Sequence, residues 1–422
     1  MREPVDDHDC LPYVYRVTKY DPADRDGWGR YTGAEDSDSD HGPVEAAYLQ
    51  AVRAFAEDSG VDRLEIREPA LAGFVHFELE PPAEGHGLAG LFPDSLAGYH
   101  DGAEVSLAVG VDLVRAMLRG AGAWCRLEVA GAFRVHVGWD QYVYVSSAAP
   151  CERALAHTRT LSLFPERLDA SPYDAASDEE PGEQRPADDD FWDRLRYLAG
   201  YGPLLLEEGH VLNSSRWHRI TQANIDTVRT GLAPRARLLV WPDLTADIDS
   251  VRSRLREEGS WELVWEDADG RISSAVVDDE ELAAVDDALS TARAAAVHSI
   301  IMDECHPLFS AVLPDADGVL RARWRTNPCP GDQRWEQLKA FQVGEVLTGT
   351  VSEIASFGVV FVDLDGVQGQ INMPELSSRQ FSHPSEIVSV GEELTVRILD
   401  VDLVRERVAL SLRSLPLSTS TR

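Results

Sequence analysis

Five short segments with the alternating pattern of β-strands follow one another near the C-terminus, between Phe341 and Leu415. Glycine-containing turns separate them, for example at Phe357-Gly358 and Asp365-Gly366. Five short strands within about 75 residues favour a small closed or nearly closed barrel, because closure removes the sheet edges that promote aggregation. This pattern constrains the fold of the chain more than any other feature of the sequence.

The same segment carries an ordered set of motifs. In chain order they are Val343-Gly344, Gly349-Thr-Val351, Phe357-Gly358, Asp365-Gly-Val-Gln-Gly369, Pro374-Glu-Leu-Ser377, Val390-Gly391 and Leu410-Ser-Leu412. In this order they resemble the S1-type RNA-binding domain, the OB-fold module of bacterial ribosomal protein S1 and polynucleotide phosphorylase. The resemblance covers roughly the last fifth of the chain. It implies an all-β OB-fold barrel at residues 340–415, followed by a tail at 416–422.

The resemblance also implies which aromatic side chains contact RNA. OB-fold barrels bind single strands by stacking unpaired bases on aromatic rings and by pairing phosphates with cations. Phe357 matches the first aromatic position of the family. The second falls on Val360, and a one-residue bulge would bring the adjacent Phe361 to the ligand face.

Three polar positions complete the implied site. Asn372 stands where the family has a histidine, and it is expected to hydrogen-bond the edge of a base. Asp402 and Arg407 match the family's aspartate and arginine pair, one residue further apart than usual, and Arg407 is expected to contact phosphate. The resemblance thus implies single-stranded RNA as the partner.

Charge favours a second hypothesis for the barrel. Residues 341–415 contain eleven acidic and five basic side chains, a net charge of −6. Because RNA affinity depends strongly on neutralising phosphates, such a module should bind weakly or through a local basic stripe. Phe357 and Phe361 could instead fill the barrel interior. An acidic OB barrel that lacks RNA affinity would serve as a protein-interaction module.

The composition of the whole chain limits its class. With 422 residues it is too long for one ordinary core and predicts two or three domains. A formal charge of −34 disfavours a bulk nucleic-acid coat or an anionic membrane as the partner. No apolar run approaches the ~20 residues that span a bilayer, and the N-terminal residues lack the apolar core of a secretory signal. We expect a cytoplasmic protein with no membrane partner.

The potential metal ligands do not predict a metal site or another cofactor. The five cysteines are widely spaced and form no Cys-x-x-Cys pair, so reduced structural thiols are expected. Asp303-Glu-Cys-His306 has ligand-type side chains, but consecutive residues cannot all face one ion. The acidic run at 36–41 lacks the glycine and distal glutamate of an EF-hand and is interpreted as a solvated loop.

Ahead of the barrel the chain divides at an acidic segment. Asp169–Asp190 contains nine acids and a single base, Arg185, and is interpreted as a flexible linker or a long acidic loop. On either side lies a similar pattern at an offset of 137 residues: Val111–Trp124 aligns with Ile248–Trp261 without gaps. Each predicts an amphipathic helix, a glycine stop and a strand that opens on tryptophan.

The pattern continues with a turn, a second strand at 133–137 or 271–277, and a helix at 151–163 or 279–296. The predicted fold class is therefore multidomain: two related α+β domains, at 1–168 and 191–336, followed by the small barrel. Elements outside the shared pattern are a strand at 13–20, a helix at 44–56, strands at 63–66 and 74–79, and a hairpin formed by 308–313 and 319–324.

Catalytic motifs are scarce in this sequence. Gly85-His-Gly-Leu-Ala-Gly90 fits a dinucleotide fingerprint by spacing, but flanking prolines favour a loop instead of a helix start. Walker-type, His-Glu-x-x-His and Gly-x-Ser-x-Gly motifs do not occur. The leading hypothesis is a non-enzymatic RNA-binding protein, associated with the ribosome, mRNA or another protein. An enzyme housed in the first two domains is a third hypothesis.

Overall fold

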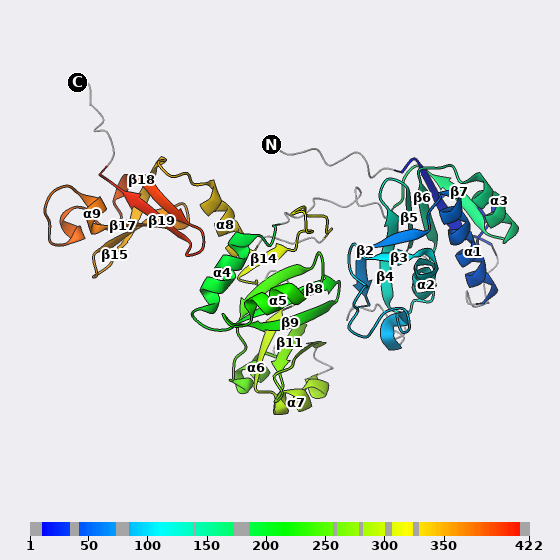
Figure 1. The fold of residues 1–422 in the computed structure, drawn as a ribbon, viewed down its shortest axis with the longest axis horizontal. Helices are drawn as coiled ribbons and strands as arrows, with labels where there is room; N and C mark the ends of the chain where they lie inside the picture. The colour runs from blue at the N-terminus through cyan, green and yellow to red at the C-terminus, as the bar shows by residue number, and fades with distance from the viewer. Residues whose placement is uncertain are drawn as a thin grey trace, which may run out of the picture.

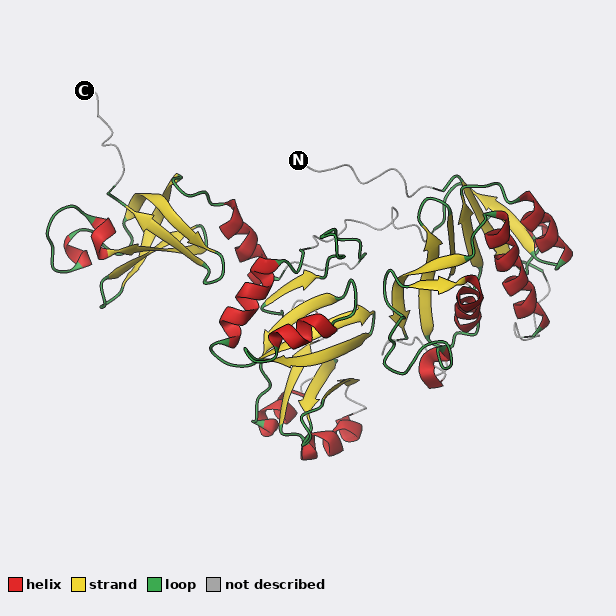
Figure 2. Cartoon of the chain, in the orientation of Figure 1, coloured by secondary structure: helices red, strands yellow, loops and turns green. Residues whose placement is uncertain are grey.

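A computed structural model describes residues 11–33, 42–72, 84–138, 141–172, 185–255, 260–277, 282–299, 306–323 and 329–413. Three β-rich units follow one another along the molecule (Figures 1 and 2). A seven-stranded sheet lies at one end, two smaller sheets lie in the middle, and a closed barrel lies at the other end. The predicted multidomain class, with α+β units ahead of a small barrel, is confirmed.

The first unit is a single antiparallel sheet in the order β3-β2-β4-β5-β6-β1-β7. Its strands are β1 (Tyr13–Thr18), β2 (Arg63–Leu71), β3 (Glu104–Ser106), β4 (Ala123–Val129), β5 (Phe133–Val137), β6 (Val143–Ser147) and β7 (Phe164–Leu168). Helices α1 (Pro43–Asp58), α2 (Leu107–Leu118) and α3 (Glu152–Thr160) accompany it. The predicted strand at 74–79 lies outside the described residues.

Helix packing explains how this sheet is covered. The Ser106 hydroxyl accepts a hydrogen bond from the Val109 amide at 3.3 Å, and so caps the N-terminus of α2. Buried residues of α1 and α2, such as Phe55 and Val114, pack in one cluster with strand residues such as Leu127.

The predicted loop at 85–90 starts with left-handed residues at Gly85, His86 and Gly87, and α2 begins only at Leu107.

The second unit contains two sheets. Strands β8 (Leu204–Val211), β9 (Ser214–Ile220), β10 (Arg237–Pro242) and β14 (Phe309–Val312) form one, in the order β14-β10-β8-β9. Strands β11 (Trp261–Glu266), β12 (Ile272–Val277) and β13 (Ala294–Ser299) form the other, in the order β12-β11-β13. The helices are α4 (Asp189–Ala199), α5 (Ile225–Gly231), α6 (Ile248–Leu255), α7 (Leu282–Thr291) and α8 (Pro330–Ala340).

The duplicated sequence pattern corresponds to a helix followed by an antiparallel strand pair in both units. These segments are α2-β4-β5 in the first unit and α6-β11-β12 in the second. Their surroundings differ, because β4 lies between β2 and β5 whereas β11 lies between β12 and β13. The domain boundaries predicted from the pattern remain predictions.

Two predictions for the second unit need correction: one helix is shorter than predicted, and one hairpin is not found among the described residues. The helix predicted at 279–296 ends at Thr291, and Ala294–Ser299 forms strand β13, because pairing with β11 buries Ala295 and Val297. The hairpin predicted from 308–313 and 319–324 does not form among the described residues. Its first half, β14, pairs with β10 instead, while the turn at Asp315–Gly318 is present.

The end of the predicted acidic linker is ordered. The Val312 amide donates to the Arg185 carbonyl at 2.7 Å, and the Ala187 amide donates to the Val312 carbonyl at 2.9 Å. Asp188 then caps α4 by accepting from the Phe191 amide at 3.0 Å. The second unit therefore includes residues from Arg185 onwards.

Backbone pairing and ion pairs join the first and second units. The Leu71 amide donates to the Leu212 carbonyl at 2.9 Å, and the Leu212 amide donates to the Pro69 carbonyl at 2.8 Å. Arg235 contacts Glu65 of β2 at 2.7 Å and Asp315 at 2.8 Å. Two β-rich units thus meet through a short backbone bridge and a partly buried charge cluster.

The potential metal ligands and cysteines named from the sequence lie only partly within the described residues. The acidic run at 36–41, Cys10 and residues 303–305 lie outside them, while Cys125, Cys151 and Cys329 are free and buried. Among the described residues, no cluster of three or more His, Cys, Asp or Glu side chains could hold a metal ion. No helix in the described part is both long enough and apolar enough to cross a membrane.

Candidate nucleic-acid interface

The barrel consists of five strands that close on themselves in the order β15-β16-β17-β19-β18. They are β15 (Val346–Ile354), β16 (Val359–Leu364), β17 (Val367–Asn372), β18 (Glu393–Asp402) and β19 (Arg407–Ser411), with a short helix α9 (Met373–Leu376) after β17. Alternation along β16 buries Val360, Val362 and Leu364 in the interior. The residues between them consequently point outwards.

Phe361 lies on the outer face of the barrel. It pairs with Gln370 of β17, which in turn pairs with Ala409 of β19. Asp363, two residues after Phe361, pairs with Gln368. Since β17 and β19 are parallel, Arg407, two residues before Ala409, lies beside Gln368. Phe361 and Arg407 therefore share one outer surface, which we call the β16-β17-β19 face.

Phe357 occupies the turn between β15 and β16 and exposes 74% of its side chain. The following Gly358 has a φ of +92°, a backbone conformation that favours glycine. A Cβ atom at this position would lie 2.8 Å from the sulfur of Met373, so the turn also packs closely against the start of α9. The Phe357 ring is thus held at the surface by a tight turn.

A β-bulge is present next to Phe361, but on the neighbouring strand. The register between β15 and β16 shifts between Val351 and Glu353, so that Val351 faces Val362 and Glu353 faces Phe361. The extra residue therefore lies in β15, whereas the sequence suggested one in β16. Phe361 faces outwards because of the ordinary alternation of β16.

The other expected site residues lie at opposite ends of the same face. Asn372 is exposed at the end of β17, opposite Val359, and immediately precedes α9. Asp402 and Arg407 face each other where β18 passes into β19. The Asp402 carboxylate accepts a hydrogen bond from the Arg405 amide at 3.0 Å, which shapes the turn between these strands. Arg407 is exposed.

The charges on this surface are mixed. Glu353, Asp363 and Asp400 are exposed on strands that border Phe361, Gln368 and Ala409. Arg405 and Arg407 supply cations at the β18-β19 end. The Asp363 and Asp402 carboxylates lie at this same end, so the local charge is mixed here too. Attraction of a phosphate to the face therefore depends on Arg405 and Arg407.

Two polar residues on this face were missed by motif reasoning. Gln368 and Gln370 project between Phe361 and β19, and their amide groups can donate and accept hydrogen bonds. Strand alternation alone places both on the outer side of β17, opposite the buried Val367 and Ile371. Register information was needed to put them beside Phe361.

Comparison with known proteins agrees with this geometry. Residues 340–413 match the family model of the S1 RNA binding domain. The C-terminal barrel is an S1-type domain. Over 96 residues the chain is 47% identical to the small ribosomal subunit protein bS1 of Mycolicibacterium smegmatis, and over 81 residues it is 44% identical to that of Streptococcus pneumoniae.

These alignments cover 23% and 19% of this chain and 20% of each relative. The chain thus spans about a fifth of the length of the curated relatives that it matches. The solution structure of GSP13 from Bacillus subtilis is 32% identical and covers 19% of this chain and 65% of that chain, with a TM-score of 0.18. The two units that precede the S1-type domain lie outside the family match.

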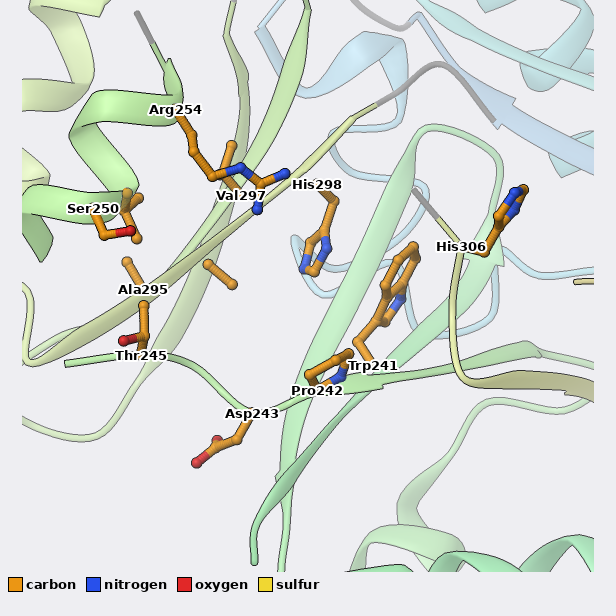
Figure 3. Close-up of a pocket in the computed structure, with 12 residues that line it drawn as sticks. Trp241, Pro242, Asp243, Thr245, Ser250, Arg254, Ala295, Val297, His298 and His306 are labelled. Carbon is orange, nitrogen blue, oxygen red and sulfur yellow. The ribbon is translucent and has the colours of Figure 1, made fainter. Parts of the chain in front are cut away.

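A separate cavity of about 250 Å³ lies in the second unit, between β10, α6 and β13 (Figure 3). The His298 ring lies 4.3 Å from the Trp241 ring, and burial lowers the pKa of His298 to about 4. Asp243 at the cavity wall pairs with Arg219 at 2.7 Å. Its carboxylate is thereby engaged in an ion pair, and His298 is neutral at pH 7.

Proposed function

We propose that this protein binds single-stranded RNA through the S1-type domain and acts without catalysing a reaction. The observation that carries the proposal is the exposure of Phe357, which is 74% exposed in the turn that leads into β16, the strand of the outward-facing Phe361. An aromatic ring that is already exposed on the barrel surface can stack against a base without a rearrangement of the barrel. Each stacked base typically contributes about 1–3 kcal/mol.

Each of the five expected site residues has a distinct role in this proposal. Phe357 and Phe361 stack bases, and Asn372 hydrogen-bonds the edge of a base. Arg407 contacts a phosphate, while Asp402 supports the turn that presents it. The acidic border limits affinity, so binding weakens steeply as salt screens Arg407.

The similar proteins suggest a setting for this activity. Both relatives described above are named as small ribosomal subunit proteins. We therefore extend the proposal to association with the ribosome or with mRNA in the cytoplasm. The first two units, divided from each other at the acidic segment, would bind a protein or ribosomal partner.

The acidic border supports a second candidate function, in which the barrel binds a protein and has no RNA affinity. Glu353, Asp363 and Asp400 would then attract a basic partner surface. A titration separates these functions. Full-length protein is titrated into a labelled 12-nucleotide oligouridylate at low salt, and the anisotropy of the label is recorded.

Binding that weakens with salt, and that falls about fivefold or more in Phe357→Ala, supports the RNA-binding function. Trp28→Ala is the matched control, because Trp28 is 90% exposed and lies in the first unit. Equal affinity in wild type and Phe357→Ala would remove the stacking role. Absence of binding at low salt would favour the protein-docking function.

A further inference from the structure

The S1-type domain touches helix α4 of the second unit at one end of its β16-β17-β19 face. Glu406, in the turn between β18 and β19, forms an ion pair with Arg194 of α4. In the same turn, the Arg405 guanidinium lies 6.0 Å from the centre of the Tyr197 ring. Figure 1 shows α4 beside the barrel, next to α8. The surface of α4 thus adjoins the turn between β18 and β19.

Tyr197 near the end of helix α4 and Tyr201, two residues after it, form a pair of rings at this junction. The Tyr197 and Tyr201 rings are 5.2 Å apart at an interplanar angle of 75°, and their hydroxyl groups are 2.8 Å apart. Tyr201 is 77% exposed. Among the described aromatic residues, Trp28, Tyr201 and Phe357 are the most exposed, at 90%, 77% and 74%. Tyr201 belongs to the second unit and Phe357 to the barrel.

Strand register shows which end of the face adjoins the turn that contacts Tyr197. Phe357 and Asn372 lie at one end of β16 and β17, and the Asp363-Gln368 pair lies at the other end, next to Arg407. The pKa of Tyr197 is raised, mainly by the hydrogen bond with Tyr201, while the charges of Arg407 and Arg405 oppose that rise. Arg407 directly follows Glu406, so it lies next to the turn that contacts α4.

We propose that Tyr197 and Tyr201 extend the RNA-binding face, so that a strand crossing Phe361 and Arg407 stacks its next base on these two tyrosines. This proposal rests on the RNA-binding function proposed above and assigns a second stacking site in a different unit. Aromatic rings beside arginine cations are the combination that holds single strands without sequence readout. The barrel turn contacts Tyr197, and the neighbouring Tyr201 ring remains exposed and can stack against a base.

Length dependence distinguishes the extended site from the barrel site. A tetranucleotide is at the lower end of OB-fold site sizes, which run from about 4 to 16 nucleotides, whereas a 12-nucleotide strand continues past Arg407. In the full-length protein, Tyr201→Ala should weaken binding of a 12-nucleotide oligouridylate about fivefold and leave a 4-nucleotide oligouridylate unchanged. Tyr201→Phe keeps the ring, and it should bind both oligonucleotides like wild type.

The controls separate this proposal from the general one. Phe357→Ala should weaken both oligonucleotides, and Trp28→Ala should weaken neither. If Phe357→Ala weakens both but Tyr201→Ala changes neither, the extension to α4 is wrong and the barrel site stands. If wild type binds neither oligonucleotide, the RNA-binding function itself fails. Unchanged thermal melting of each variant verifies that the fold is intact.

Discussion

Glu406 and Arg194 lie 212 positions apart in the sequence and form an ion pair that joins the S1-type domain to helix α4. Arg194 is buried, with its guanidinium 4.3 Å from the Phe309 ring and 4.9 Å from the Trp335 ring. Burial lowers the pKa of Arg194, and the Glu406 carboxylate opposes that change. One carboxylate in a barrel turn therefore helps to fix the position of the barrel against the second unit.

Replacing Glu406 with Gln should loosen this contact. The substitution leaves a buried cation without its anionic partner, which we expect to cost about 1–3 kcal/mol of docking free energy, because Glu406 is partly exposed. Energy transfer between dyes on the barrel and on the second unit should report a broader distance distribution. The matched control is Glu393→Gln on the exposed face of β18. Identical distributions in wild type and Glu406→Gln would show that other contacts hold the barrel.

Glu262 should make stability depend on pH. Burial, reinforced by the nearby Glu207, raises the pKa of Glu262 to about 7 in the folded protein. The unfolded chain releases this proton near pH 4.3, so stability is fully present below that pH and falls as the pH rises towards 7. Glu262→Gln removes this loss and should raise the melting temperature at pH 7.5.

The gain at pH 7.5 corresponds to about 3–4 kcal/mol, and it should vanish at pH 4. Asp269→Asn serves as the control, because Asp269 is exposed in the turn between β11 and β12. Calorimetric melting at both pH values gives the comparison. A gain of the same size at pH 4 would indicate an effect unrelated to the ionisation of Glu262.

Gly349 in β15 should tolerate no side chain. A Cβ atom there would lie 2.6 Å from side-chain carbons of both Leu364 and Val362, and 2.8 Å from the Asp363 carbonyl oxygen. Gly349→Ala should therefore destabilise the barrel by about 1–3 kcal/mol through overpacking. Hydrogen exchange of the β15 and β16 amides measures the loss. Thr348→Ala, at an exposed neighbouring position, should exchange like wild type.

Arg235 should stabilise the contact between the first two units. It pairs with Glu65 and Asp315, and it lies 3.5 Å from Asp101, whose carboxyl group is almost fully buried and has a raised pKa. Arg235→Gln leaves these carboxylates less compensated, so we expect a loss of about 3 kcal/mol in urea unfolding. Arg252→Gln provides the contrast.

Arg252 pairs with Asp286, whose side chain is 65% exposed, and a surface pair of this kind contributes about 0–1 kcal/mol. The two variants remove the same charge and differ in the burial of the partners. Equal losses in both variants would show that the Arg235 cluster contributes no more than a surface pair.

The barrel could be predicted from sequence because its information is local. Each strand alternates buried and exposed residues, and turn glycines such as Gly358 and Gly366 separate the strands, so the number of strands and their positions along the chain follow from the pattern. Exposure of Phe357 agrees with the expected position of an aromatic residue at a surface turn. The functional roles of the five expected site residues remain proposals.

Other features depend on contacts that no local pattern contains. Ala294–Ser299 has helix-forming alanines, yet it becomes a strand because β11 offers an unpaired edge that buries Val297. The bulge beside Phe361 lies in β15, since register is a property of the strand pair. Tyr197 lies beside the barrel because a turn about 200 residues later in the sequence docks against α4.

The pairing between β17 and β19 has a further consequence. These strands are parallel and meet through only two residue pairs, Gly369 with Val408 and Gln370 with Ala409, whereas the other strand pairs of the barrel are antiparallel and longer. This strand pair is the one whose separation breaks the fewest backbone hydrogen bonds. A ligand lying over Phe361, Gln370 and Ala409 contacts both strands of this pair and would hold them together. The free energy of unfolding of the barrel should therefore rise with the concentration of bound ligand.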